Sequence, residues 1–200
     1  DVMKDHPSID VFENMPLDTD ILKEADYHLM FEGIIENNTR AETVNAYDLF
    51  GEYFCIKLND DEKIPYLTVD KNNLEYFKNI EKNFIKIDKP LKIGIHLKTS
   101  SIIRDIPHET WNEIVRELLS FSNRICLYFI GSEDDLGVMN KIVFPQSSVG
   151  RVMPFCSNTR GFKDSVAAIS EMDCMLGGDS SGVHIAAAFK IPIVAMFGAF

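Results

Sequence analysis

The sequence predicts an α/β fold, a Rossmann-like parallel sheet with helices on both faces. Two observations lead to this prediction. From Leu91 onward, short apolar runs alternate with amphipathic segments of helical length, which is the pattern of successive strand–helix–strand units. The apolar runs are also nearly continuous, as expected for parallel strands that are buried on both faces. We expect the crossover connections between these strands to be right-handed.

The predicted elements follow one another in a regular order. We expect strands over residues 91–97, 125–130, 149–153, 174–176 and 193–197, and helices over residues 107–121, 134–142, 159–171 and 182–189. In sheets of this kind, ligands bind beyond the carboxyl ends of the strands. The loops that follow the strands therefore contain the candidate functional residues.

The pattern before Leu91 is less regular. We expect a strand over residues 27–31 that ends near Gly33, and a helix over residues 41–50 with Gly51 as its C-cap. A further amphipathic helix is expected around Phe77, because apolar residues recur there at helical spacing.

We expect a hinge at the turn-forming residues Asp88-Lys89-Pro90, which divide these two parts of the sequence. We expect residues 1–88 to be the end of a preceding domain with its connection. Residues 89–200 are expected to be the Rossmann-like domain, truncated at its carboxyl end, since a last strand usually needs a further element to cover it.

The composition argues against several classes of partner. The 200 residues carry a net charge of −11, from 31 acidic and 20 basic side chains, and contain no dense basic stripe. Nucleic acid and anionic lipid are bound through clustered Lys and Arg, so neither is expected. No apolar stretch reaches the roughly 20 residues of a transmembrane helix, and no secretory signal is visible. We therefore expect a cytoplasmic protein with no transmembrane segment.

The four cysteines are far apart and form no CxxC pair. Cys126 and Cys174 lie in apolar runs, where a reduced thiol acts as a small hydrophobe. This usage is typical of a reducing compartment. No cluster of His, Cys and carboxylate residues has metal-ligand spacing, so no metal site is expected.

The loop after the fourth predicted strand carries the strongest functional signal. It contains Asp179, Ser180, Ser181 and Gly182, and it leads directly into a helix of small residues with His184 in its first turn. The free N–H groups and the positive dipole end of such a helix form an anion site. We expect a phosphate or diphosphate there. The alternative is that Asp179 or Ser180 only caps the helix.

This segment also carries a resemblance to a known family. Asp-Ser-Ser-Gly-Val-His-Ile-Ala-Ala-Ala, followed by Ile-Pro-Ile-Val-Ala-Met-Phe-Gly, resembles the signature of family 9 glycosyltransferases, the heptosyltransferases of lipopolysaccharide synthesis and their relatives. The resemblance assigns Asp179, Ser180, Ser181, Gly182 and His184 to the donor diphosphate. Ser181 stands where the family commonly has glycine.

The loop after the first predicted strand is similar to the family's first donor loop. By this resemblance Thr99, Ser100 and Arg104 contact the diphosphate. Arg104 takes the place of the usual lysine, and Ile106 stands where tryptophan is usual. An arginine can still form two bonds to a phosphate. The alternative for Arg104 is a solvated surface charge.

Two further segments resemble the family's nucleoside contacts. Glu133 follows the second strand, where the family's glutamate can bond the ribose hydroxyls, and Met153-Pro154 resembles the segment that lines the nucleobase pocket. Glu133 could equally be an acid in the first turn of a helix. The alternative for Met153 is the end of a strand.

The resemblance implies the carboxyl-terminal part of a GT-B enzyme. In that architecture, two Rossmann-like domains face each other, and the amino-terminal one supplies the acceptor contacts and a general base. The implied reaction transfers a sugar, a heptose or hexose, from a nucleotide-diphosphate donor to a hydroxyl of a glycan or lipid-linked glycan acceptor such as lipopolysaccharide, with inversion. No cofactor is implied. No general base can be assigned in these residues, and we expect this fragment alone to be inactive.

Two alternatives stay open. A sugar-nucleotide epimerase of the same architecture shares an Asp-Ser-Gly turn, and a non-catalytic module would bind a nucleotide without transferring a sugar. Release of a sugar product without any acceptor would favour the epimerase. Only a turnover assay separates the binding module from the transferase.

Overall fold

The structure is a computed structural model that describes residues 9, 20, 23, 26 and 28–197. The chain divides into two compact units, one formed by Tyr66–Phe200 and the other by Met3–Pro65. Each unit is described by itself. Gly198, at the end of the sequence resemblance, lies outside the described residues.

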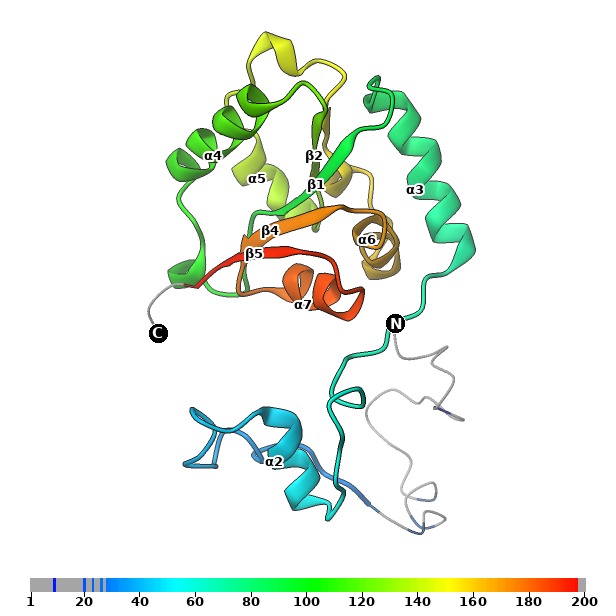
Figure 1. The fold of residues 1–200 in the computed structure, drawn as a ribbon, viewed down its shortest axis with the longest axis vertical. Coiled ribbons are helices and arrows are strands. Elements are labelled where there is room, and N and C mark those ends of the chain that lie inside the picture. The colour runs from blue at the N-terminus through cyan, green and yellow to red at the C-terminus, as the bar shows by residue number, and fades with distance from the viewer. Residues whose placement is uncertain (1–8, 10–19, 21–22, 24–25, 27, 198–200) are drawn as a thin grey trace. The chain divides into compact units, whose positions relative to one another are not determined.

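The larger unit contains a five-stranded sheet in the order β3-β2-β1-β4-β5 (Figure 1). The strands are β1 (Leu91–His96), β2 (Ile125–Phe129), β3 (Val152–Met153), β4 (Cys174–Gly178) and β5 (Ile193–Met196). Every neighbouring pair is parallel, which confirms the predicted fold class. The strand order reverses between β1 and β4. The carboxyl edge at this point is where doubly wound sheets bind ligands.

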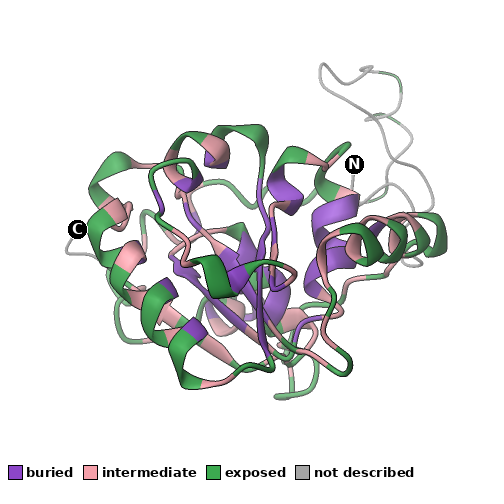
Figure 2. Ribbon diagram, turned by 90° about the horizontal axis from the view of Figure 1, so that it is seen from above, coloured by how far each residue is buried: buried purple, intermediate pink, exposed green. Residues whose placement is uncertain are grey.

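Helices cover both faces of the sheet (Figure 1). One face carries α4 (His108–Phe121) and α5 (Leu136–Met139), and the other carries α3 (Lys71–Phe84), α6 (Phe162–Ile169) and α7 (Ser181–Ala188). Side chains on alternate positions of β2 point to the two faces, since Cys126 and Tyr128 belong to one apolar cluster and Leu127 and Phe129 to the other. Figure 2 shows the buried residues gathered along the sheet and the inner sides of the helices.

The helix expected around Phe77 is α3, and it packs on this sheet. Asp70 caps it by accepting a hydrogen bond from the Asn72 amide at 2.7 Å. The Phe77 side chain is fully buried, and burying a side chain of this size contributes about 1.5–3 kcal/mol. The Tyr128 hydroxyl donates to Glu81 of α3 at 2.6 Å. The helix thus lies in the compact unit that begins at Tyr66, although its residues precede the predicted domain boundary between residues 88 and 89. That boundary stays a prediction.

Three elements of this unit are shorter than predicted by more than one residue. β3 begins at Val152 because residues 146–148 form a 3-10 turn and Gly150 adopts a left-handed backbone with φ +77°. The helix predicted over residues 134–142 is a 3-10 turn followed by the four residues of α5. α6 begins only at Phe162, because the Asp164 carboxylate accepts hydrogen bonds from the backbone and side chain of Arg160 and holds that residue outside the helix.

Two predictions for the smaller unit are wrong. Residues 28–31 form no strand, and Tyr27 lies outside the described residues. The Phe31 ring instead packs edge-on against Phe50 and Phe54, and no neighbouring strand is present in the described part of this unit to form a ladder. Gly51 lies inside α2 (Ala46–Tyr53) and is not its C-cap. A side chain there would bring Cβ within 2.5 Å of a backbone oxygen, so packing explains this glycine.

Candidate functional site

A cavity of about 640 Å³ opens at the carboxyl edge of the sheet, a volume within the range of small-molecule sites. Small residues of the loop after β1 and of the segment from the end of β4 into α7 line part of its wall: Thr99, Ser100, Ser180, Ser181 and Gly182. Another part is apolar and contains Ile130, Phe162, Ile169 and Ile185. The cavity therefore combines five of the predicted diphosphate residues with an apolar surface.

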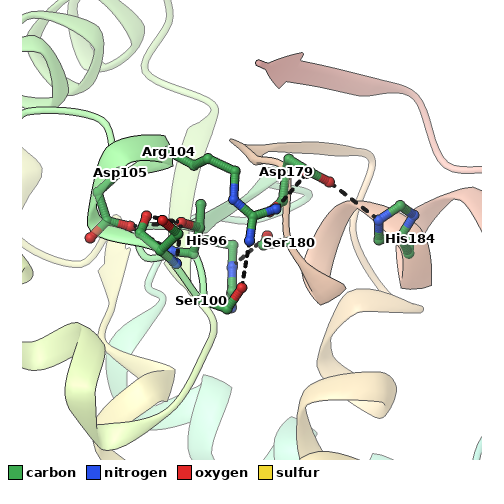
Figure 3. A network of polar contacts seen from close by, with 9 residues as sticks. His96, Ser100, Arg104, Asp105, Asp179, Ser180 and His184 are labelled. Atoms are coloured by element: carbon green, nitrogen blue, oxygen red, sulfur yellow. Dashed lines mark hydrogen bonds and ion pairs between the residues drawn. The ribbon is translucent and has the colours of Figure 1, made fainter. Parts of the chain in front are cut away.

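The first turn of α7 lies in this wall, at Ser181 and Gly182. Ser180 is the N-cap residue by position, with extended backbone angles, but no side chain caps the helix. The Ser180 Oγ lies instead 2.8 Å from Nδ1 of His96, the last residue of β1 (Figure 3). The uncapped amides and the helix dipole favour an anion at this end of α7.

Two glycines allow the loops after β1 and β4 to approach each other. A Cβ on Gly178 would lie 2.8 Å from Cγ2 of Thr99, and a Cβ on Gly182 would lie 3.0 Å from Cβ and Cγ of His96. Any larger residue at either position would push the two loops apart. The glycines therefore keep the polar wall of the cavity continuous.

The loop after β1 is held by a carboxylate that the sequence patterns did not indicate. Asp105 accepts hydrogen bonds from the Thr99 amide at 2.7 Å and from the Thr99 hydroxyl at 3.1 Å. The same hydroxyl also lies 2.7 Å from the backbone oxygen of Ser101. These contacts fix the short turn that presents Thr99 and Ser100 to the cavity.

Arg104, Asp179 and His184 lie beside the cavity wall and are not part of it. Arg104 Nη1 donates to Asp179 Oδ2 at 2.6 Å, and their side chains are 23% and 21% exposed. The other Nη of Arg104 donates to the Ser100 hydroxyl. The second oxygen of Asp179 lies 3.5 Å from His184 Nε2. Figure 3 shows this chain of contacts across the two loops. The charge of Arg104 is thus balanced by Asp179.

Asp135 is a buried carboxylate in the cavity wall, 3% exposed, that the sequence analysis also missed. It accepts hydrogen bonds from the backbone amides of Lys98 at 3.0 Å and Ser132 at 2.9 Å. It therefore joins the loop after β1 to the loop after β2. The Ser132-x-x-Asp135 spacing, a capping box, was the available signal in the sequence.

The three predicted nucleoside residues do not line this cavity. Glu133 is exposed in the 3-10 turn after β2. Met153 is fully buried in the apolar cluster under α3, and Pro154 turns its backbone oxygen toward Ser157 and Asn158. Their nucleoside contacts stay predictions. Phe162, which is 46% exposed, is the aromatic ring in this part of the wall.

Burial lowers the pKa of His96 below its ordinary value, although the nearby Asp135 charge acts in the opposite direction. The imidazole is therefore neutral near pH 7, and its unprotonated nitrogen can accept a hydrogen bond from a hydroxyl. Burial also raises the pKa of the Cys126 and Cys156 thiols to about 11, so both stay protonated. Within residues 28–197, no group of three His, Cys, Asp or Glu side chains could hold a metal ion.

No helix in the described part of the chain is long and apolar enough to cross a membrane.

A five-stranded parallel sheet with the β3-β2-β1-β4-β5 order and a cavity at its switch point defines a Rossmann-like α/β domain. Residues 38–200 match the family model of glycosyltransferase family 9 (heptosyltransferase), and the chain belongs to this family. No curated protein matches the sequence.

Two solved structures share the fold. The Escherichia coli ADP-heptose lipopolysaccharide heptosyltransferase II has 21% identity and a TM-score of 0.58, over 69% of this chain and 41% of that one. A family 9 glycosyltransferase from Veillonella parvula has 16% identity and a TM-score of 0.63, over 78% of this chain and 44% of that one. The chain thus spans less than half the length of either structure.

Proposed function

We propose that this chain is the donor-binding part of an inverting glycosyltransferase, which transfers a heptose or hexose from a nucleotide-diphosphate sugar to a hydroxyl of a glycan or lipid-linked glycan acceptor such as lipopolysaccharide. The observation that carries the proposal is the uncapped first turn of α7 in the wall of the cavity. Family membership supports the reaction class. One structure with the same fold is named for an ADP-heptose donor and a lipopolysaccharide acceptor.

The proposed chemistry places negative charge on the departing nucleoside diphosphate. Backbone N–H groups in the first turn of α7, from Ser181 to Val183, would hold that charge, and the Thr99 and Ser100 hydroxyls would add to them. Such groups are fixed before the reaction, and donors that need no reorganisation stabilise a transition state most effectively. The sugar-bearing phosphate would thus lie at the junction of the loops after β1 and β4.

Two basic residues offer N–H donors to the proposed diphosphate, although Asp179 already balances the charge of Arg104. Lys98 lines the cavity and has no ion-pair partner among residues 28–197. Arg104 uses only part of its five N–H donors on Asp179 and Ser100, so the rest stay free for a phosphate oxygen. In this proposal, these two side chains bind the charged diphosphate, and no cofactor takes part.

The apolar part of the cavity supports a nucleoside at its other end. Phe162 offers a partly exposed aromatic face, and every nucleobase can stack on such a face. The isoleucines at positions 130, 169 and 185 also line the cavity and add apolar surface to it. The cavity would then take the whole nucleoside diphosphate, with its charged end toward α7.

The proposal is tested by titrating the purified chain with ADP, GDP and UDP and with their sugar conjugates in a calorimeter. We expect one base to be preferred and the sugar conjugate to bind in the same cavity. Absence of heat with all of them would contradict the proposal.

Turnover is tested on the full-length protein with the bound donor and a glycan acceptor. Transfer to the acceptor, with an inverted anomeric centre, is expected. An altered sugar or sugar nucleotide released without any acceptor would indicate the epimerase. Binding without any turnover would indicate a nucleotide-binding module.

A further inference from the structure

The hydroxyl of Ser180 does not cap α7, although Ser180 occupies the N-cap position. A serine at the N-cap ordinarily accepts a hydrogen bond from the second or third amide of its helix. Here those amides belong to Gly182 and Val183, and no side chain caps α7. The Ser180 Oγ is bound to His96 Nδ1 at 2.8 Å instead. The local group best suited to close the helix end is therefore held elsewhere.

His96 is fixed in place from both sides. It ends β1, the central strand of the sheet, where it is paired with Gly177 of β4. The start of α7 lies directly on it, since a Cβ on Gly182 would come within 3.0 Å of His96 Cβ and Cγ and within 3.2 Å of Met175. The backbone pairing and the close approach of Gly182 thus fix the base of the imidazole, and the ring bonds to Ser180 at the edge of the cavity (Figure 3).

We propose that His96 is a positioning residue that holds the Ser180 hydroxyl away from the first turn of α7 and so keeps the Gly182 and Val183 amides open for an anionic ligand. The contact between His96 and Ser180 is observed. Its effect on ligand binding rests on the proposed diphosphate site. Without His96, the Ser180 hydroxyl rotates onto these amides and a ligand must displace it. A cap of the ordinary strength would weaken binding by about 2- to 30-fold.

A matched set of variants tests this inference. His96→Phe keeps a ring over Gly182 but cannot bond the hydroxyl, and His96→Leu serves if the phenylalanine variant does not fold. His96→Asn is the conservative variant, because its amide places a polar atom near the position of Nδ1. Ser180→Ala removes the hydroxyl, and the double variant His96→Phe/Ser180→Ala completes a cycle.

The first readout is the affinity for ADP, GDP or UDP, whichever the wild-type chain binds. We expect His96→Phe to lose about 2- to 30-fold and His96→Asn to recover most of that loss. The double variant should bind as Ser180→Ala does, because the histidine has no further effect once the hydroxyl is gone. A purely structural His96 would cause the same loss in both backgrounds, and that result would overturn the inference.

The second readout needs no ligand. Amide hydrogen exchange of Gly182 and Val183 is followed in the free protein. Exchange should become slower in His96→Phe, since the amides gain a cap, and the slowing should be absent in the double variant. If this pattern appears while no nucleotide binds, the proposed function is wrong and the role of His96 stands. If nucleotide binds and exchange is unchanged in His96→Phe, the inference about His96 is wrong and the proposed function stands.

Discussion

Arg104 and Asp179 form an ion pair of 2.6 Å that joins the loop after β1 to the loop after β4. The two residues are 75 positions apart in the sequence, and both come from loops that the sequence assigned to the diphosphate. The pair therefore fixes the distance between the two loops on whose contact the site depends.

Breaking this ion pair should destabilise the fold. We expect Arg104→Gln to lower the free energy of unfolding by about 1–2 kcal/mol, because a charged acceptor that is mostly shielded from water loses its donor. Urea denaturation of Arg104→Gln, Asp179→Asn and the double variant measures the coupling. If the two single effects simply add, the pair does not hold the loops together.

Removal of the buried charge of Asp135 should also destabilise the fold. Its carboxylate accepts bonds from the Lys98 and Ser132 amides, and Asp135→Asn leaves a weaker acceptor for them. We expect a loss of about 1–3 kcal/mol. Asp134→Asn is the matched control, since Asp134 is exposed. Equal effects of the two substitutions on the urea midpoint would contradict the structural role of Asp135.

Phe162 should contribute to the binding of a nucleoside diphosphate but not to the binding of pyrophosphate. We expect Phe162→Ala to weaken the binding of a nucleoside diphosphate by about 5- to 150-fold, because base stacking on an aromatic ring is worth about 1–3 kcal/mol. The affinity for inorganic pyrophosphate should not change. Phe121→Ala is the control, since Phe121 is an exposed ring at the end of α4. An equal loss for pyrophosphate would place Phe162 outside the nucleoside contact.

The pKa of His96 predicts a loss of stability in acid. Since burial lowers this pKa in the folded state, the unfolded chain takes up a proton first as the pH falls below about 6.5. Stability should therefore decrease from pH 6.5 downward, and the decrease ends below the folded-state pKa. The free energy of unfolding of wild type and His96→Phe is compared at pH 7.5, 6.5 and 5.5. A variant with the same pH dependence as the wild type would show that His96 is not responsible.

The sequence was sufficient for most of the sheet because its signals are local. Each strand buried on both faces is a nearly continuous apolar run, and all five predicted strands of residues 89–200 are present. The errors lie where tertiary contacts decide. β3 starts late because Gly150 turns the backbone, and Gly51 is a packing glycine within α2. Residues 28–31 are apolar enough for a strand but have no strand beside them in the described part of their unit.

The candidate site was predictable in part for the same reason. Thr99, Ser100 and Ser180 follow strands directly, and strands of a parallel sheet bring their carboxyl ends to one edge. The hydrogen bond between Lys98 and Asp135 spans 37 positions of the sequence, and the one between His96 and Ser180 spans 84. The Ser132-x-x-Asp135 spacing is a local signal, but no periodicity or spacing indicates contacts over such separations. The contact of Asp135 with Lys98 and that of Ser180 with His96 therefore emerged only from the structure.

The central claim is that the open amides at the start of α7 bind a diphosphate, and a charge reversal at Ser181 tests it most directly. Ser181→Asp places a carboxylate on these amides, whereas Asn123→Asp adds the same charge at an exposed turn before β2. Calorimetric titration with the preferred nucleoside diphosphate should show at least about tenfold weaker binding for Ser181→Asp and wild-type affinity for Asn123→Asp. Equal affinity of Ser181→Asp and the wild type would contradict the account.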